Sequence, residues 1–311
     1  MVKLTIFTPV YNASKYIKQT IDSILSQRFT DWELLLYDDG STDNSKEIIK
    51  RYASNDSRFK YKYFEHTGNP AYLRNEALKA GKGEWFANCD HDDIWHPYKL
   101  ELQFNLIQRL HLDSIVFTEH YNFKNPPNKV DIEGLYQYLN IMPIKETDDI
   151  PYQKINTNTF LNGNYIMNSS VLIHRKVIDK IGLLNQEIGF RGMEDTEYWL
   201  RAACQEIEFY RINLVLSFWR VHDDNLSYDR PYQKDQAIIE VINKARKCKN
   251  MKVEYKFDFY YMMTYLKLSI SRKKFHQKKS FIFLIKYGYF RFLFFIFIIM
   301  KKIELIFNNK K

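Results

Sequence analysis

The chain has 311 residues, which is enough for one large domain or for a domain with an appendage. Its three cysteines are widely spaced and form no CxxC pair, which argues against a zinc site. The formal net charge of +9 is unevenly distributed: residues 241–311 carry 18 Lys and Arg against 3 Asp and Glu, whereas residues 1–240 carry 28 against 34. A mildly acidic body with a strongly basic tail predicts that the tail meets a polyanion.

Strand-like and helix-like patterns alternate through the first 120 residues. Apolar runs and period-two alternation predict strands over 3–9, 32–39, 59–65, 84–90 and 114–120. Apolar residues at helical spacing, with capping residues at the ends, predict helices over 13–27, 41–53, 70–81 and 97–109. This alternation predicts an α/β fold, Rossmann-like, with a mostly parallel sheet flanked by helices.

The rest of the body is less regular. Residues 122–165 have no clear period and are expected to form a surface insertion or a sheet edge, whereas residues 169–182 predict a strand followed by a helix. There is no Walker A loop, and no GxGxxG follows a strand, which argues against a P-loop NTPase or a Rossmann dehydrogenase. The N-terminal residues MVKLTIFTPVYN lack the long apolar run of a secretory signal, so we expect a cytoplasmic protein.

Three polar clusters follow three of the predicted strands. They are TPVYN at residues 8–12, YDDGSTDNS at 37–45 and CDHDD at 89–93. Ligands of parallel α/β sheets bind at the carboxyl ends of the strands, so we expect the three clusters to line one cleft. Each cluster taken alone would be read as an ordinary polar loop.

The cluster CDHDD places Asp90, Asp92 and Asp93 at the end of a hydrophobic strand. Like charges there repel one another and resist desolvation, so something must compensate them. Carboxylates on a short loop are a common way to hold Mg²⁺ or Mn²⁺ beside a diphosphate, because these hard cations take oxygen ligands. The alternative is an acidic helix N-terminus, which accounts for one aspartate better than for three.

Three segments resemble the conserved blocks of family 2 glycosyltransferases, and they occur in the family's order. They are TPVYNASKYIKQTIDSILSQRFTDWELLLYDDGSTDNS, LRNEALKAGKGEWFANCDHDDIWHP, which holds the DxD motif, and GFRGMEDTEYWLRA, which holds the ED motif. The resemblance covers roughly residues 3–225 and implies the GT-A fold. It divides the chain into a catalytic domain over 1–240, with a nucleotide-binding half to about residue 120 and an acceptor-binding half from 121, and a helical extension over 241–311.

The resemblance also implies roles in nucleotide binding. The residues implied to hold the nucleotide at the end of the first strand are Pro9, Val10, Tyr11 and Asn12. Asp39 matches the aspartate that bonds the uracil edge, and Arg74 matches an arginine near the base and diphosphate. In the DxD motif, Asp90 is implied to meet the ribose or metal-bound waters, and His91 to lie against the ligand.

The remaining roles concern metal binding and catalysis. Asp92 matches the direct ligand of Mn²⁺ or Mg²⁺, and His222 matches a histidine that completes the metal site, whereas Asp93 is taken as a helix cap. Asp195 matches the catalytic base, with Glu194 beside it. The family inverts the anomeric centre, which implies direct displacement with one base. The alternative interpretation of EDTEYW is that it is only the solvent-exposed start of a helix.

Further histidines, His66, His96 and His174, have no HxxxH or HExxH spacing and are predicted to be loop or surface residues. The polymerising members of the family carry a QxxRW motif that this sequence lacks, which favours transfer of a single sugar.

The tail combines basic residues with Phe-rich segments. The uninterrupted apolar run at 292–300 is too short to span a bilayer, and Lys286 and Arg291 interrupt the longer one. This pattern favours an interfacial helix on an anionic membrane through residues about 272–311. The alternatives are a helical hairpin packed on the catalytic domain or on a second protomer, and a nucleic-acid-binding tail, against which the aliphatic content argues.

The sequence therefore predicts an inverting, metal-dependent glycosyltransferase. It would move a sugar from a UDP-sugar to a hydroxyl of a glycan or lipid-linked saccharide in bacterial capsule, lipopolysaccharide or exopolysaccharide synthesis. We expect it to act peripherally at the inner face of the plasma membrane, without nucleic acid, and we leave a homo-oligomer open. The alternative is a non-catalytic nucleotide-sugar-binding or scaffold protein of the same fold.

Overall fold

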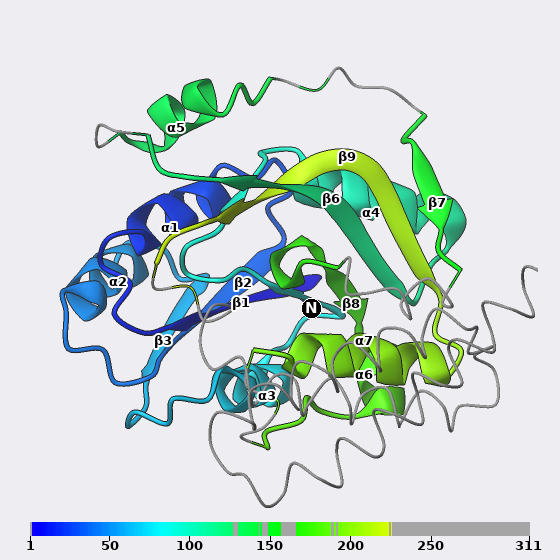
Figure 1. Ribbon diagram of the computed structural model, residues 1–311, viewed down its shortest axis with the longest axis horizontal. Coiled ribbons are helices and arrows are strands. Elements are labelled where there is room, and N and C mark those ends of the chain that lie inside the picture. The colour runs from blue at the N-terminus through cyan, green and yellow to red at the C-terminus, as the bar shows by residue number, and fades with distance from the viewer. Residues whose placement is uncertain are drawn as a thin grey trace, which may run out of the picture.

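The computed structural model describes residues 2–126, 130–142, 144, 149–156, 166–187, 190, 192–223 and 225. These residues form one nine-stranded sheet with helices on both faces, which confirms the predicted α/β architecture (Figure 1). Within the described ranges, no helix is long and apolar enough to cross a membrane.

The first half of the chain builds the parallel part of the sheet. Its elements, in order, are β1 (Leu4–Val10), α1 (Ile17–Leu25), β2 (Trp32–Asp38), α2 (Ser45–Ala53), β3 (Phe59–Tyr63), α3 (Pro70–Ala80), β4 (Trp85–Asn88), β5 (Ile94–Trp95) and α4 (Lys99–Leu110). Strands β3, β2, β1 and β4 lie side by side and run parallel, with Leu4 of β1 opposite both Trp32 and Trp85. Every residue of β1, β2 and β4 is buried, as expected for strands covered on both faces.

The second half completes the sheet. Its elements are β6 (Ile115–Phe123), α5 (Ile132–Tyr138), β7 (Tyr152–Lys154), β8 (Leu172–His174), α6 (Arg175–Ile181), α7 (Glu194–Cys204) and β9 (Phe209–Arg220). Strand β8 is antiparallel to both β4 and β6, and β9 runs parallel to β6. The sheet order is therefore β3-β2-β1-β4-β8-β6-β9-β5, with β7 paired to β9.

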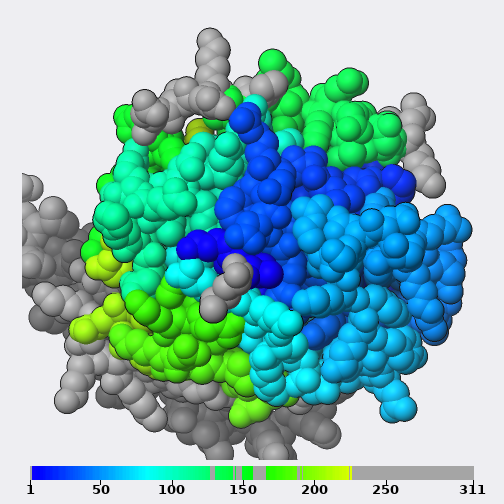
Figure 2. All heavy atoms as spheres, turned by 180° about the vertical axis from the view of Figure 1, so that it is seen from behind, coloured from blue at the N-terminus to red at the C-terminus, as the bar shows by residue number. Residues whose placement is uncertain are grey.

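Two hydrophobic cores hold the helices to the sheet. On one face, α1, α2 and α4 pack through fully buried residues such as Ile17, Ile21 and Phe104. On the other face, α3, α6 and α7 pack through smaller clusters that include Leu73 and Tyr198. Seen as spheres, the blue N-terminal part and the green later part divide one face of the molecule between them (Figure 2).

Gly83 allows β4 to approach β1. A Cβ added at Gly83 would lie 2.3 Å from the Thr5 backbone nitrogen and 2.6 Å from the Trp85 carbonyl oxygen. Because both atoms belong to the backbone, a side chain there would separate the strands. Close pairing at this end fixes where β4 ends, and therefore where residues 89–93 lie.

Two local expectations were wrong. The segment after residue 122 is not irregular throughout, because β6 continues to Phe123 and is followed by α5, whose N-cap Asp131 accepts a hydrogen bond from the Gly134 nitrogen. In addition, the alternative interpretation of the acidic cluster as a helix N-terminus is wrong, although the helix expected over 97–109 is present as α4. Strand β5 intervenes, and the N-cap residue of α4 is Tyr98.

Candidate active site

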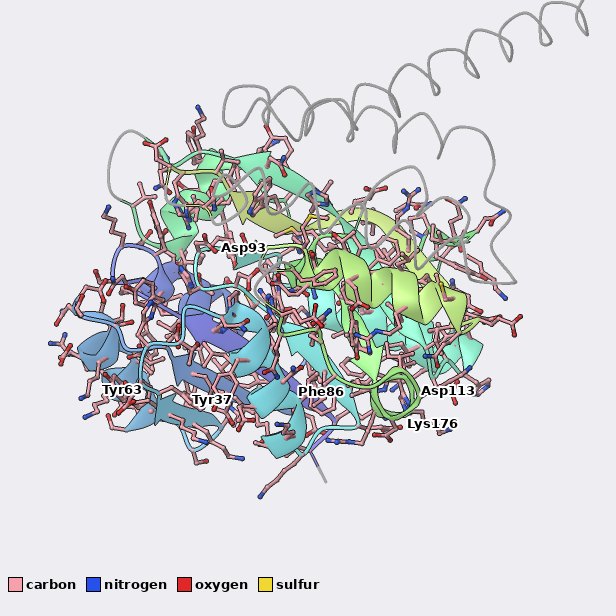
Figure 3. The ribbon with its side chains drawn as sticks, turned by 60° about the horizontal axis from the view of Figure 1, so that its bottom comes forward. Tyr37, Tyr63, Phe86, Asp93, Asp113 and Lys176 are labelled. Carbon is pink, nitrogen blue, oxygen red and sulfur yellow. The ribbon has the colours of Figure 1, made fainter. Side chains whose placement is uncertain are left out.

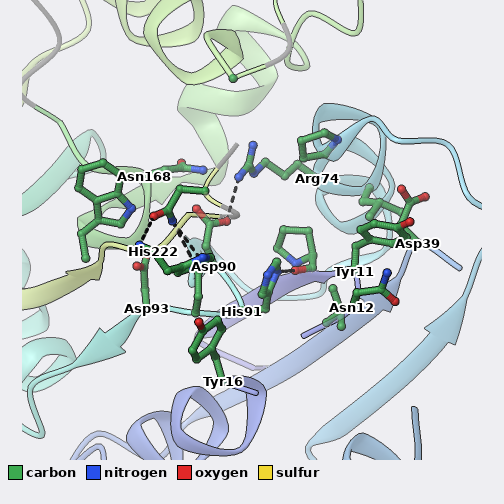
Figure 4. Close-up of a pocket in the computed structure, with 18 of the residues that line it drawn as sticks. Tyr11, Asn12, Tyr16, Asp39, Arg74, Asp90, His91, Asp93, Asn168 and His222 are labelled. Atoms are coloured by element: carbon green, nitrogen blue, oxygen red, sulfur yellow. Dashed lines mark hydrogen bonds and ion pairs between the residues drawn. The ribbon is translucent and has the colours of Figure 1, made fainter. Parts of the chain in front are cut away.

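The loops that follow β1, β2, β3 and β4 open into one cavity of about 1230 Å³ at the carboxyl ends of these strands. All twelve residues predicted to act at a site line it, namely Pro9, Val10, Tyr11, Asn12, Asp39, Arg74, Asp90, His91, Asp92, Glu194, Asp195 and His222. Figure 4 places Tyr11, Asn12 and Asp39 on one flank of the cavity and Asp93, Asn168 and His222 on the other. The ion pair between Asp113 and Lys176 lies well away from Asp93 in the molecule (Figure 3).

The loops after β1 and β2 are bonded to each other. Asn12 has a positive φ of 46°, which asparagine tolerates, and its side-chain oxygen accepts a hydrogen bond from the Thr42 nitrogen at 2.9 Å. The Ser14 nitrogen donates to the Asp43 carboxylate at 2.8 Å. These contacts hold the two polar clusters together at one end of the sheet, as expected from their positions after neighbouring strands.

Asp39 is buried against the segment between β3 and α3. Its carboxylate accepts hydrogen bonds from the nitrogen and hydroxyl of Thr67, both at 2.8 Å, and from the Gly68 nitrogen at 2.9 Å. The ring of His66 stacks on Tyr11 with 4.2 Å between centroids. His66 is an exposed loop residue, as predicted, but it also lines the cavity, and its position after a third neighbouring strand was the signal that could have identified this.

Each carboxylate of the acidic cluster has its own partners. Asp90 bonds Arg74 at 2.8 Å and the Asn88 amide at 2.9 Å. Asp92 accepts a hydrogen bond from His222 Nε2 at 2.8 Å. Asp93 accepts hydrogen bonds from the Ser169 hydroxyl and, at 3.3 Å, from the Arg220 nitrogen, so it is a buried acid and not a helix cap.

The environments of Asp92 and Asp93 move their pKa values in opposite directions. Burial raises the pKa of Asp93 well above its usual range, and the neighbouring Asp92 and Asp90 raise it further. Burial alone would also raise the pKa of Asp92, but the nearby His91 and the hydrogen bond from His222 outweigh it and lower that pKa. The surroundings therefore favour the ionised form of Asp92 and the protonated form of Asp93.

Arg74 joins this cluster to α7. Its guanidinium bonds Asp90 and, on the other side, Glu194, and it is itself buried. The Glu194 carboxylate also accepts a hydrogen bond from the Gly192 nitrogen at 2.6 Å. Glu194 thus orients the start of α7, where Asp195 follows it, by pairing with a fixed cation.

Asp195 is partly exposed in the cavity and accepts a hydrogen bond from the Thr196 nitrogen at 2.6 Å. Burial and the neighbouring Glu194 raise the pKa of Asp195 to about 6. A carboxylate with such a pKa is ionised at neutral pH and is a better proton acceptor than an ordinary aspartate.

Asp92 and His222 are the side chains that could together contribute ligands to a divalent cation. Two adjacent ligands of a six-coordinate Mg²⁺ or Mn²⁺ ion lie about 3 Å apart, since each ligand bond is about 2.1 Å long. The Asp92 Oδ2 and His222 Nε2 atoms are 2.8 Å apart at the cavity wall. In the described part of the chain, no three His, Cys, Asp or Glu side chains form a complete cation site, so most ligands would come from substrate and water.

Three residues that the sequence analysis did not single out support these groups. Arg220 is fully buried and donates from Nε to the Asp92 carbonyl at 2.7 Å. The Ser169 hydroxyl bonds the Asp90 nitrogen as well as Asp93, and Asn225 donates to Asp92 at 3.3 Å. Asn225 follows the predicted His222 closely, but no local pattern marks Ser169. Of the other histidines predicted to be loop or surface residues, His96 lies in a loop but is buried, whereas His174 is buried in β8, so for His174 the prediction was wrong.

A family model, "Glycosyl transferase family 2", matches residues 5–182, and the chain belongs to this family. It is 26% identical over 227 residues to "Putative teichuronic acid biosynthesis glycosyltransferase TuaG" of Bacillus subtilis, which covers 73% of this chain and 82% of that protein. It is 28% identical over 228 residues to "UDP-Glc:alpha-D-GlcNAc-diphosphoundecaprenol beta-1,3-glucosyltransferase WfgD" of Escherichia coli, covering 73% and 80%. Some relatives are much longer: the match covers 32% of an uncharacterized glycosyltransferase of Rickettsia bellii.

Solved structures share the fold. S. aureus TarS 1–349 in complex with UDP-GlcNAc superposes with a TM-score of 0.62 at 15% identity, covering 86% of this chain and 80% of that one. Mannosyltransferase PcManGT from Pyrobaculum calidifontis, in complex with GDP-Man and Mn²⁺, gives 0.57 at 16% identity, covering 91% and 79%. The predicted GT-A fold, family and enzyme class are therefore confirmed: the protein is a glycosyltransferase of family 2.

Replacing Arg74 should destabilise the protein through its two carboxylate partners. Arg74→Met leaves Asp90 and Glu194 without their shared cation, so we expect the free energy of unfolding to fall by about 3–5 kcal/mol. Urea denaturation followed by circular dichroism measures it. The control is Lys79→Met on the same helix, whose exposed pair with Glu76 should cost less than about 1 kcal/mol. Equal losses in both variants would contradict this role for Arg74.

Proposed function

We propose that the protein is an inverting, metal-dependent glycosyltransferase that moves a sugar from a UDP-sugar to a hydroxyl of a glycan or lipid-linked acceptor. The observation that carries the proposal is the meeting of Asp39, the Asp92–His222 pair and Asp195 in one cavity. The printed names of relatives support the substrates: WfgD uses UDP-Glc and a diphosphoundecaprenol-linked acceptor, and TuaG is assigned to teichuronic acid biosynthesis. The process is accordingly synthesis of a bacterial surface glycan.

The nucleotide binds at the flank that holds Asp39. A carboxylate offers about four acceptor positions, and the Thr67 and Gly68 donors use three of those on Asp39. His66 Nδ1 also lies 3.2 Å from Asp39 Oδ2, but its hydrogen bond is to the Asp39 backbone oxygen at 2.8 Å. The remaining position accepts the N–H of the uracil edge. The Tyr11 and His66 rings next to it provide a flat surface for the base.

Asp92 and His222 would hold Mn²⁺ or Mg²⁺ in this mechanism. When bound, the ion supplies positive charge that stabilises the departing nucleoside diphosphate. Asn225 donates a hydrogen bond to the Asp92 carboxylate beside His222, and Arg220 holds the Asp92 backbone through its carbonyl oxygen. Arg74 is already bonded to two carboxylates, so its role is to fix Asp90 and Glu194 next to the donor.

Asp195 acts as the base. The acceptor oxygen forms a bond to the anomeric carbon, the bond from that carbon to the diphosphate oxygen breaks, and the acceptor proton passes to Asp195. Single displacement inverts the anomeric centre and needs no second carboxylate. Glu194 stays paired with Arg74 and positions Asp195.

The first test is Mn²⁺-dependent release of nucleoside diphosphate from a panel of UDP-, GDP- and other nucleotide sugars. We expect slow hydrolysis of one UDP-sugar and at least about a hundredfold loss of turnover in Asp92→Asn and in Asp195→Asn, because each removes a reacting group. Asp195→Asn should still bind UDP. Asp113→Asn, remote from the cavity, is the matched control.

The outcome separates enzyme from binding protein. UDP binding without turnover of any donor, with or without added glycan acceptors, would favour the alternative of a non-catalytic nucleotide-sugar-binding or scaffold protein. Full activity in Asp195→Asn would refute that residue as the base.

The activity should depend on pH through Asp195. Because the raised pKa of Asp195 is about 6, its carboxylate accepts a proton above that pH and is already protonated below it. We expect log kcat to rise with unit slope up to about pH 6 and then to level off. The residual activity of Asp195→Asn should lack this rise below about pH 6. A wild-type pH profile that is flat from pH 4.5 to 7.5 would contradict the assignment of Asp195 as the base.

We also propose that residues about 272–311, which lie outside the described residues, bind an anionic membrane, placing the enzyme at the inner face of the plasma membrane. Their basic residues and Phe-rich segments support this. Flotation of the full chain with vesicles containing anionic lipid should be lost with neutral vesicles. It should also be lost when Arg272, Lys273, Lys274, Lys278 and Lys279 are changed to Gln. Flotation that persists with neutral vesicles and with the Gln-substituted protein would refute the proposal.

A further inference from the structure

The cavity is larger than a donor requires and extends to a second region of the sheet. Its volume of about 1230 Å³ exceeds the roughly 300–1,000 Å³ of pockets for one small molecule. Strands β6 and β9 lie beyond β4 and β8 from β1, so at about 4.8 Å per strand β6 is about 14 Å from β1. A donor held by the loops after β1, β2 and β4 leaves the β6–β9 side for a second ligand.

Irregular pairing shapes this side of the cavity. Thr118 of β6 pairs with Ile212 of β9, and His120 pairs with Ser217, so β9 advances five residues while β6 advances two. Such bulges bend a strand and redirect its side chains, and β9 is visibly arched in Figure 1. Beyond the bulges, His120 and Trp219 both line the cavity, whereas Tyr121 is 56% exposed.

The chemistry of this pair suits a sugar. Trp219 is partly exposed and adds a large aromatic surface to a cavity whose other groups include the charged Asp92 and Asp195. A pyranose ring has an apolar C–H face that packs on an aromatic ring, and the indole N–H can meet a hydroxyl. Burial lowers the pKa of His120, so its imidazole is neutral at pH 7 and can both donate to and accept from a sugar hydroxyl.

We propose that Trp219 and His120 form the subsite for a pyranose ring of the acceptor, an inference that rests on the proposed function. The acceptor's terminal unit is therefore a sugar and not a polyol or a bare polyprenyl phosphate. Asp195 lines the same cavity, so the proposed base and the subsite open onto the same space. Donor binding depends on the other flank of the cavity, so mutations should be able to weaken acceptor binding without weakening donor binding.

The experiment measures binding of octyl glycosides of glucose, galactose, mannose and N-acetylglucosamine to the full chain with saturating UDP and Mn²⁺, by saturation-transfer NMR. We expect at least one glycoside to bind. Trp219→Ala should weaken that binding about tenfold and Trp219→Phe about threefold, because a stacked aromatic contributes up to about 1.4 kcal/mol, which is a factor of ten. His120→Ala should weaken it by a similar factor. Affinity for UDP, measured by calorimetry, should change less than twofold in each variant.

Tyr121→Ala is the control, since that exposed residue of β6 lies beside His120 but does not line the cavity. Unchanged glycoside binding in Trp219→Ala would overturn the subsite, as would a parallel loss of UDP affinity, which would make Trp219 a general support of the site. Binding of ribitol phosphate in place of any glycoside would also overturn it, while leaving the proposed function standing. Failure of the wild-type protein to bind or turn over any nucleotide sugar would instead reject the proposed function and the subsite with it.

Discussion

The site depends on the compensation of buried negative charge at the end of β4. Asp90, Asp92 and Asp93 lie at the end of a fully buried strand, where unpaired carboxylates would be unstable. Their partners come from three separate parts of the chain: Arg74 on α3, Ser169 before β8 and His222 after β9. The hydrogen bonds and ion pairs of these carboxylates thus connect the two halves of the fold, and the cavity lies where the halves meet.

This arrangement links donor binding to catalysis. Arg74 bonds Asp90 on the donor side and Glu194 at the start of α7, so one guanidinium sets the position of α7 relative to the acidic cluster. Asp195 follows Glu194 in the chain, so the Arg74–Glu194 ion pair also sets the position of Asp195. Burial and the same negative neighbour raise the pKa of Asp195, so in the proposed mechanism Glu194 acts through placement and electrostatics and not by contact with substrate. A displacement of α7 would therefore disturb both Asp195, the proposed base, and Asp90, the carboxylate on the proposed donor side.

The order of the strands divides the cavity between its ligands. Parallel strands β1, β2 and β3 carry the nucleotide flank, β4 carries the acidic cluster, and β6 and β9 carry Trp219 and His120 beyond it. The antiparallel strand β8 separates these regions and brings Ser169 beneath the acidic loop. Family membership accounts for the shared donor side. The bulged pairing of β6 with β9 redirects side chains on the other side of the cavity, where we propose the acceptor subsite.

The sequence by itself determined the strand and helix pattern of the first 120 residues and the positions of the polar clusters. Periodicity and capping are local properties, and clusters after parallel strands must share one edge of the sheet. It did not determine that Arg74 is held between Asp90 and Glu194, that Asp93 is a buried acid, or that Ser169 and Arg220 support the acidic loop. Those contacts join residues far apart in the chain, and His66 and Trp219 likewise gain their surroundings only from neighbouring strands. Burial and long-range pairing decide charge state and orientation, and they exist only once the sheet has closed.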